Sequence, residues 1–129
     1  DIQESIEKLE DFSKDFTDLH FQIALNYGSR DEITRAVNRM LEDQKAGKLE
    51  TPVSEDTISD YLDTAGIPDP DLMIRTSGEQ RLSNYLMWQH AYSEFYFTDV
   101  PWPKFDKAEL VKALEAYTCR DRRYGKVKA

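Results

Sequence analysis

The chain has 129 residues, of which 40% are hydrophobic and 33% are charged, a size and composition typical of one soluble globular domain. Its formal net charge of −8 at pH 7 argues against a nucleic-acid-binding surface, because a polyanion requires a basic footprint. The single cysteine, Cys119, cannot form an internal disulfide, and no apolar run approaches the roughly 18 residues that a membrane span needs. These features predict a cytoplasmic protein with one domain, residues 1–129.

The start of the chain predicts a helix followed by a strand. Apolar residues recur at spacings of three and four through residues 2–17, which is the pattern of an amphipathic helix with a solvated charged face. Residues 21–25 alternate between large apolar side chains and polar or small ones, which indicates a strand. We expect this strand to end at Asn26-Tyr27-Gly28, where the glycine permits a sharp turn.

Two helices are expected next. Ser29 and Glu32 have the spacing of a capping box, which predicts a helix that stops near Gly47. Ser54 is placed to open a shorter helix, and Gly66 is placed to close it.

The second half of the chain predicts two strands separated by a polar loop. The short apolar run of residues 72–74 follows two prolines and indicates a buried strand. Ser83 is a candidate N-cap for a short helix carrying residues 85–88. Residues 94–98 are typical of another strand, with a carboxylate at its start.

The chain closes with an irregular segment and a helix. Pro101 and Pro103 lack backbone donors and exclude regular structure around them. Asp106 and Glu109 frame a last capped helix, which Gly125 is expected to end. The whole order predicts an α/β protein, part of a mostly parallel sheet flanked by helices.

The loop after residues 72–74 carries side chains suited to an anion. Ligands of open α/β sheets lie beyond the carboxyl ends of the strands, so this loop and residues 26–28 should share one rim. Arg75, Arg81 and Ser83 can each donate hydrogen bonds, and a guanidinium can hold a phosphate with two of them. The alternative is that Arg75 and Arg81 pair with Glu79 on a solvated loop.

Two groups of residues resemble a known family. Asn26-Tyr27-Gly28-Ser29-Arg30 is similar to a motif of the Asn-Tyr-Gly-Gly-Arg type, with Ser29 in place of the second glycine. The longer match consists of Ile74-Arg75-Thr76-Ser77-Gly78-Glu79, Arg81, Ser83-Asn84, Trp88-Gln89, Ala91-Tyr92, Glu94 and Trp102-Pro103. Together these residues resemble the cis-prenyltransferases, and specifically the C-terminal half of bacterial undecaprenyl diphosphate synthases.

The resemblance implies roles for the polar loop. Arg75, Arg81 and Ser83 match positions that hold the diphosphate of isopentenyl diphosphate in the family, and Glu79 would orient the two arginines. The resemblance also gives a supporting role to two further residues, Asn26 and Arg30. For these two, a capped strand-to-helix turn with Arg30 on the surface is an equal alternative.

Three further positions carry roles implied by the family. Glu94 matches a carboxylate associated with Mg²⁺ at the diphosphate, although an isolated glutamate at a strand edge is usually only a surface charge. Arg123 and Gly125 match a C-terminal Arg-x-Gly element that reaches the neighbouring subunit's site, with a basic helix end as the alternative. Lys104 stands where the family commonly has an aspartate, so any role of that aspartate is in doubt here.

The resemblance implies a transferase that condenses isopentenyl diphosphate onto an allylic diphosphate, such as farnesyl diphosphate, with cis geometry. The expected product is undecaprenyl diphosphate, the lipid carrier of bacterial cell-wall synthesis. The expected enzyme is a homodimer that uses Mg²⁺ and touches the inner face of the membrane to deliver its lipid product. Alternatives are a non-catalytic partner subunit of a two-component prenyltransferase and a general phosphate- or nucleotide-binding module.

The resemblance covers only the second half of the family's pattern. The family's Asp-Gly-Asn-Gly-Arg motif, which holds the allylic diphosphate, does not occur among these 129 residues. We therefore expect the chain by itself to have no transferase activity.

Overall fold

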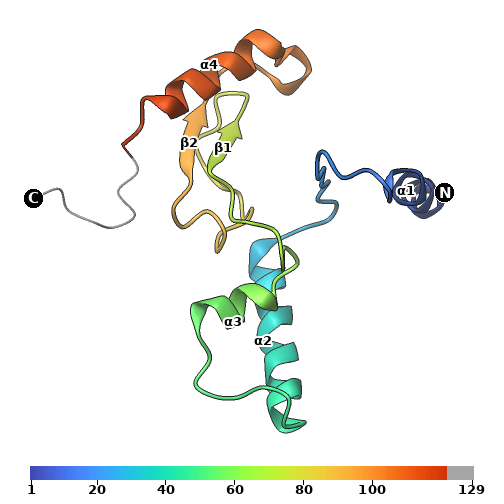
Figure 1. Cartoon of the computed structure of the whole chain (residues 1–129). Coiled ribbons are helices and arrows are strands. Elements are labelled where there is room, and N and C mark those ends of the chain that lie inside the picture. The colour runs from blue at the N-terminus through green and yellow to red at the C-terminus, as the bar shows by residue number, and fades with distance from the viewer. Residues whose placement is uncertain (122–129) are drawn as a thin grey trace, which may run out of the picture.

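The computed structural model describes residues 1–121, in which a small parallel sheet lies between helices (Figure 1). The two strands lie near the centre, α4 crosses their far end, and α1 stands apart on an extended segment. The elements in chain order are α1 (Ile2–Ser13), α2 (Ser29–Lys45), α3 (Glu55–Asp60), β1 (Leu72–Arg75), β2 (Glu94–Phe97), a 3₁₀ turn η1 (Trp102–Lys104) and α4 (Lys107–Thr118).

The sheet consists of β1 and β2, which pair in parallel. Leu72 lies opposite Glu94, and Arg75 lies opposite Phe97. Both strands therefore end at the same edge, where the loop from β1 meets the segment that follows β2. The pairing confirms the predicted α/β class with a parallel sheet.

The sequence signals for α2 and α3 hold at two of four ends. Ala46 caps the last turn of α2, and Gly47 follows with a φ of 71°, the left-handed conformation that glycine adopts without a Cβ penalty. Ser54 and Thr57 form a capping box at the start of α3. The predicted end of α3 at Gly66 is wrong, because the helix already ends at Asp60, where the backbone of Tyr61 turns back to the carbonyl of Ile58 at 3.0 Å. The start of α2 differs from the prediction, as described with the site below.

The last helix begins as predicted and ends earlier. The side chain of Asp106 accepts a hydrogen bond from the backbone of Glu109 at 3.1 Å. The helix stops at Thr118, before Gly125, which lies outside the described residues. Ala113 is the buried residue of α4.

The predicted strand at residues 21–25 is wrong. These residues have no regular structure, and the side chain of Phe21 is 77% exposed. A strand requires a neighbour for its backbone groups, and within residues 1–121 β1 and β2 pair only with each other. The first helix is also shorter than predicted and ends at Ser13.

The predicted helix after Ser83 is wrong as well. Ser83, Asn84 and Leu86 have φ values of 50°, 62° and 43°. These values lie in the left-handed region, which a right-handed helix of non-glycine residues cannot use. Residues 82–92 instead form a succession of turns.

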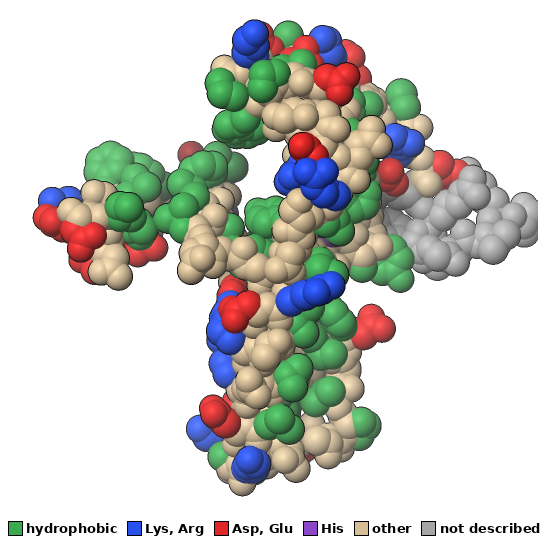
Figure 2. Space-filling view, turned by 180° about the vertical axis from the view of Figure 1, so that it is seen from behind, with side chains coloured by type: hydrophobic (Ala, Val, Ile, Leu, Met, Phe, Trp, Pro, Cys, Tyr) green, Lys and Arg blue, Asp and Glu red, His purple; other side chains and the backbone are tan. Residues whose placement is uncertain are grey.

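The interior contains both apolar and polar residues. The buried apolar side chains are Ala36, Met40, Leu62, Met73 and Ala113, and the buried polar ones are Ser29, Glu32, Gln89 and His90. Many apolar side chains remain on the surface, including those that cover α1 and the segment after it (Figure 2). None of the helices in residues 1–121 combines the length and the apolar character needed to cross a bilayer.

Candidate anion-binding site

The loop after β1 is fixed over the end of β2. The backbone N–H of Ser77 donates to the carbonyl of Val100 at 3.1 Å, and that of Gly78 donates to Thr98 at 2.9 Å. Gly78 has a φ of 70°, and a Cβ there would lie 3.0 Å from the Asp99 carboxylate. The loop thus needs a glycine at this position both for its backbone conformation and for space.

The arginines and the serine of the predicted site lie on this loop and the strand before it. Arg75, the last residue of β1, donates from Nη2 to Ser83 Oγ at 3.4 Å. Arg81 is ion-paired with Glu79, and its side chain is 65% exposed. An exposed ion pair contributes little stability, so Arg81 can exchange Glu79 for a more highly charged anion. The structure therefore brings Arg75 and Ser83 together and leaves Arg81 accessible.

The residues after Ser83 form the N-terminal cap of α2. The backbone N–H groups of Ser29 and Arg30 donate to the carbonyl and to Oδ1 of Asn84, at 2.8 Å and 2.9 Å. Gly28, the N-cap residue, makes no side-chain cap, and a Cβ at Gly28 would lie 2.8 Å from Asn84 Nδ2. Asn84 therefore supplies the cap from a distant part of the chain.

The predicted capping box of Ser29 and Glu32 is wrong for the same reason. Ser29 is the first residue of α2, and its Oγ accepts a hydrogen bond from the backbone of Met87 at 3.0 Å. Because Asn84 already occupies the first amides of the helix, the N-terminus of α2 is not open to an anion. The candidate site therefore depends on the side chains of the loop.

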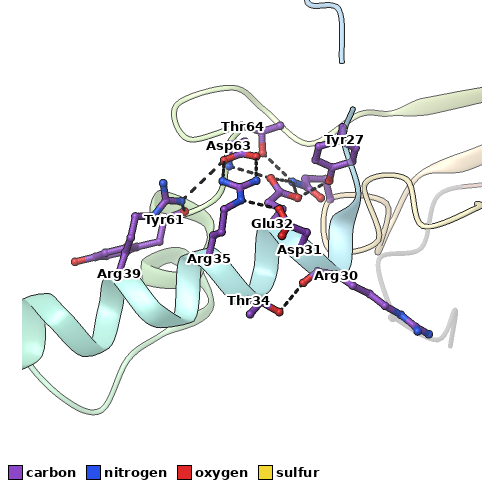
Figure 3. Close-up of polar contacts among 11 residues, drawn as sticks. Tyr27, Arg30, Asp31, Glu32, Thr34, Arg35, Arg39, Tyr61, Asp63 and Thr64 are labelled. Carbon is purple, nitrogen blue, oxygen red and sulfur yellow. Dashed lines mark hydrogen bonds and ion pairs between the residues drawn. The ribbon is translucent and has the colours of Figure 1, made fainter. Parts of the chain in front are cut away.

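Arg30 and Asn26 lie beside this contact. Arg30 is exposed, and Figure 3 shows its side chain directed away from the polar cluster on α2. It lines a hollow of about 320 Å³ together with Leu82, Asn84 and Met87. Asn26 is exposed in the turn before α2, with a φ of 51°.

The carboxylate of Glu32 is buried and lies near Tyr27, Asp63 and Thr64 (Figure 3). The side chain is fully buried, and its Oε1 accepts from the backbone of Asp63 at 2.9 Å and from Gln89 Nε2 at 3.2 Å. Its Oε2 accepts from Gln89 Nε2 at 3.3 Å and from the hydroxyl of Tyr27. Gln89 also donates to Thr64 Oγ1 at 3.0 Å. We call residues 27–32 and 83–89 together the clasp.

The surroundings of Tyr27 are consistent with its role as a donor. Burial and the hydrogen bond to Glu32 raise the pKa of Tyr27 from 10.0 to about 12. The phenol therefore keeps its proton at neutral pH and donates it to the carboxylate. Asp63, which donates its N–H to Glu32, has a side chain bound to Arg35 at 2.8 Å, and this contact lowers the pKa of Asp63.

His90 lies buried next to the clasp, although its sequence context indicated no role. Its Nδ1 is 2.8 Å from Ser93 Oγ, which itself donates to the carbonyl of Pro70. The ring lies between the rings of Tyr85 and Phe95, with centroid distances of 6.2 Å and 5.8 Å. Burial lowers the pKa of His90, so the neutral ring packs in this position.

The structure does not place Glu94 beside the arginines. Glu94 begins β2, whereas Arg75 ends β1 opposite Phe97. Along the strand direction, Glu94 and Arg75 are therefore three residues, or about 10 Å, apart. Its carboxylate lies 3.7 Å from Arg120 Nε. No cluster of three or more metal-ligating side chains occurs among residues 1–121. A single carboxylate still suits Mg²⁺, which takes most of its ligands from phosphate and water.

Arg123 and Gly125, the remaining predicted site residues, lie outside the described residues. The sequence-based prediction also missed three residues that build the clasp, namely Glu32, Asn84 and Gln89. Asn84 and Gln89 stand in the longer family-like motif, and Glu32 follows the shorter one by two residues. Their polar contacts, however, join positions 31 to 57 residues apart. Spacing along the chain carries no signal for such contacts.

These features define an α/β protein with a loop that carries two arginines at the carboxyl edge of a parallel sheet. Residues 1–125 match the prenyltransferase family described as "Putative undecaprenyl diphosphate synthase". The chain belongs to this family of cis-prenyltransferases.

Curated relatives and solved structures agree with this assignment. The chain is 52% identical to an isoprenyl transferase of Clostridium perfringens over 90% of its length and 46% of the relative's. It is also 52% identical to an isoprenyl transferase of Fusobacterium nucleatum over 98% of its length and 53% of the relative's. The chain thus spans about half the length of the curated relatives it matches.

Two solved structures have the same fold. Lavandulyl diphosphate synthase from Lavandula x intermedia, in complex with dimethylallyl diphosphate, matches with a TM-score of 0.92 and 38% identity, covering 96% of this chain and 54% of that one. A probable undecaprenyl diphosphate synthase from Campylobacter jejuni matches with a TM-score of 0.81 and 36% identity, covering 97% and 56%.

Proposed function

We propose that this chain supplies the diphosphate-binding loop of a transferase that condenses isopentenyl diphosphate onto an allylic diphosphate with cis geometry. Its similarity to isoprenyl transferases supports the reaction class. A structural neighbour whose complex contains dimethylallyl diphosphate supports a prenyl diphosphate as ligand.

The single observation that carries the proposal is the contact between Arg75 and Ser83 at the carboxyl edge of the sheet. A phosphate oxygen beside this contact can accept hydrogen bonds from both side chains at once. Arg81 lies in the same loop and is exposed, so its guanidinium can hold the second phosphate with two parallel bonds. The protein then works by positioning the diphosphate and offsetting its charge.

The finer assignments belong to the same proposal. The allylic substrate is farnesyl diphosphate and the product is undecaprenyl diphosphate. Glu94 provides one carboxylate ligand of Mg²⁺, which would help to neutralise the departing diphosphate. Asn26 and Arg30 support the site, and Arg123 and Gly125 complete a neighbouring one in a homodimer. The enzyme acts in the cytoplasm at the inner face of the membrane.

Calorimetric titration of the chain tests the binding proposal, with isopentenyl diphosphate, pyrophosphate, inorganic phosphate and ATP as ligands. We expect the two diphosphates to bind more tightly than inorganic phosphate and ATP. Arg81→Lys should weaken diphosphate binding about tenfold although it keeps the charge, because an ammonium lacks the guanidinium fork. Equal binding of all four ligands would instead indicate a general phosphate-binding module.

A turnover assay tests the proposal about activity. The 129-residue chain with farnesyl diphosphate, isopentenyl diphosphate and Mg²⁺ should form no product, because the Asp-Gly-Asn-Gly-Arg motif does not occur among its residues. Product formation by the purified chain would contradict this part of the proposal.

A further inference from the structure

The geometry points to Glu32 as a positioning residue for the diphosphate loop. Its buried carboxylate holds residues 83–89 against the first turn of α2, and this contact fixes Ser83 where Arg75 reaches it. The inference rests on the proposed function, because it treats Arg75 and Ser83 as ligands of a diphosphate.

The carboxylate of Glu32 accepts every hydrogen bond it makes. Its two oxygens receive donors from Tyr27, Asp63 and Gln89, which is the pattern of an ionised carboxylate. All of these partners are neutral groups. A charge buried in this way is costly unless hydrogen bonds and a favourable dipole offset the lost hydration.

The position of Glu32 in α2 offsets part of that cost. Glu32 lies in the first turn of the helix, where the helix dipole favours a negative charge. An apolar side chain would fill the same space without burying a charge. The carboxylate is therefore better explained by what it holds in place than by stability alone.

What it holds is the loop that carries Ser83. Gln89 at one end of the loop binds Glu32, Met87 binds Ser29, and Asn84 caps the helix. The contacts of these three residues all end on the first turn of α2. Since Ser83 precedes Asn84 directly, this docking sets the point at which Ser83 meets Arg75.

Substitution Glu32→Gln tests the inference, with Glu42→Gln as its matched control. The control makes the same chemical change on the same helix at an exposed position. Calorimetry with pyrophosphate, well below both unfolding midpoints, should give a Kd about tenfold higher for Glu32→Gln, the loss expected when a buried hydrogen-bond network is broken. Glu42→Gln should bind like the unsubstituted chain.

The NMR signal of the Arg75 Nε–H group provides a readout that mere destabilisation would not move. We expect this signal to shift in folded, ligand-free Glu32→Gln and to stay in place in Glu42→Gln. The exchanged pair Glu32→Gln with Gln89→Glu returns a carboxylate to the same cluster and should recover most of the pyrophosphate affinity. If Glu32→Gln does not fold, Gln89→Met removes the same bond from the loop side and should show the same two effects.

The outcomes separate the inference from the proposed function. If the unsubstituted chain binds no pyrophosphate, the proposed function fails, and the Arg75 signal alone decides whether Glu32 positions the loop. If the chain binds pyrophosphate, the inference is overturned by a folded Glu32→Gln with unchanged Kd and an unmoved Arg75 signal. A lower melting temperature without either change would leave Glu32 a structural residue only and would also overturn it.

Discussion

The N-terminal arm, residues 1–26, exposes apolar side chains, whereas the clasp buries polar ones. The arm carries regularly spaced apolar residues, yet Phe12 and Leu19 are 72% and 79% exposed. The clasp carries polar residues, yet Glu32 and Gln89 are 0% and 2% exposed. An apolar period therefore does not determine what covers a segment, whereas matched donors and acceptors determine where two segments meet.

The largest expected loss of stability comes from Gly28→Ala, which adds a methyl group inside the clasp. The backbone at Gly28 is extended, with a φ of −150° and a ψ of 125°, so alanine meets no dihedral strain. The added Cβ would lie 2.8 Å from Asn84 Nδ2 and should lower the free energy of unfolding by about 1–3 kcal/mol.

Chemical denaturation measures this loss, and Asn84→Ala provides the control background. Gly28→Ala should cost little in a chain that already has Asn84→Ala, because the clashing amide is gone. An equal cost in both backgrounds would show that Asn84 is not the obstacle.

A smaller effect is expected from Tyr27→Phe, which removes one donor from the buried carboxylate of Glu32. The loss should be about 1 kcal/mol, the usual net contribution of one hydrogen bond, because Gln89 Nε2 still donates to the same oxygen. Tyr61→Phe is a matched control, since the Tyr61 hydroxyl donates to a different carboxylate, that of Asp43, at 2.7 Å. If Tyr27→Phe were as stable as the unsubstituted chain, the bond to Glu32 would contribute nothing.

Tyr27 should also make the stability of the fold depend on alkaline pH. The pKa of Tyr27 is raised from 10.0 to about 12, so the fold favours the protonated phenol. Its stabilisation is complete below pH 10 and is lost as the pH rises through about 12. Melting temperatures measured across this range should fall more steeply for the unsubstituted chain than for Tyr27→Phe.

His90 should make the stability of the fold depend, more weakly, on acidic pH. Burial lowers the pKa of this ring, so the fold favours the neutral form and loses stability as the pH falls below about 6.5. His90→Phe should flatten the melting temperature between pH 7.5 and pH 5, whereas His20→Phe, at an exposed position, should not. A parallel decline in all three chains would contradict the assignment.

The smallest effect on stability is expected in the arm. Phe12→Glu changes an exposed side chain, and the free energy of unfolding should stay within about 0.5 kcal/mol. Sedimentation should nevertheless reveal weaker self-association, because an exposed apolar surface favours contact between molecules. A change of several kcal/mol would mean that the arm packs against the rest of the chain.

Local signals predicted much of this fold. The helix start at Ser54, the N-cap at Asp106 and the stop at Gly47 each act within one helical turn, and each is found where expected. The strand predicted at residues 72–74 from an apolar run after two prolines is found as β1, which extends one residue further to Arg75. The parallel pairing was predicted from the order of helices and strands. Such features depend on neighbours along the chain, which the sequence displays directly.

The failures have a common cause in distant contacts. Residues 21–25 have a strand pattern, but a strand also needs a paired neighbour. Ser83 has the sequence context of an N-cap. In the structure, however, both oxygens of Asn84 accept hydrogen bonds from α2, and Ser83 and Asn84 adopt left-handed backbone conformations. Motif and chemistry predict Arg75, Arg81 and Ser83 as site residues, whereas the buried contact of Glu32 depends on Gln89, a residue 57 positions away.

The cap that Asn84 provides for α2 has a consequence during synthesis. The amides of Ser29 and Arg30 leave the ribosome 54 or more residues before their partner does. Until Asn84 emerges, the beginning of that helix has only water to bind and remains frayed. The first turn of α2 is therefore completed only when the loop with Asn84 docks on it. Deuterium uptake at these two amides on nascent chains of increasing length would show the chain length at which this happens.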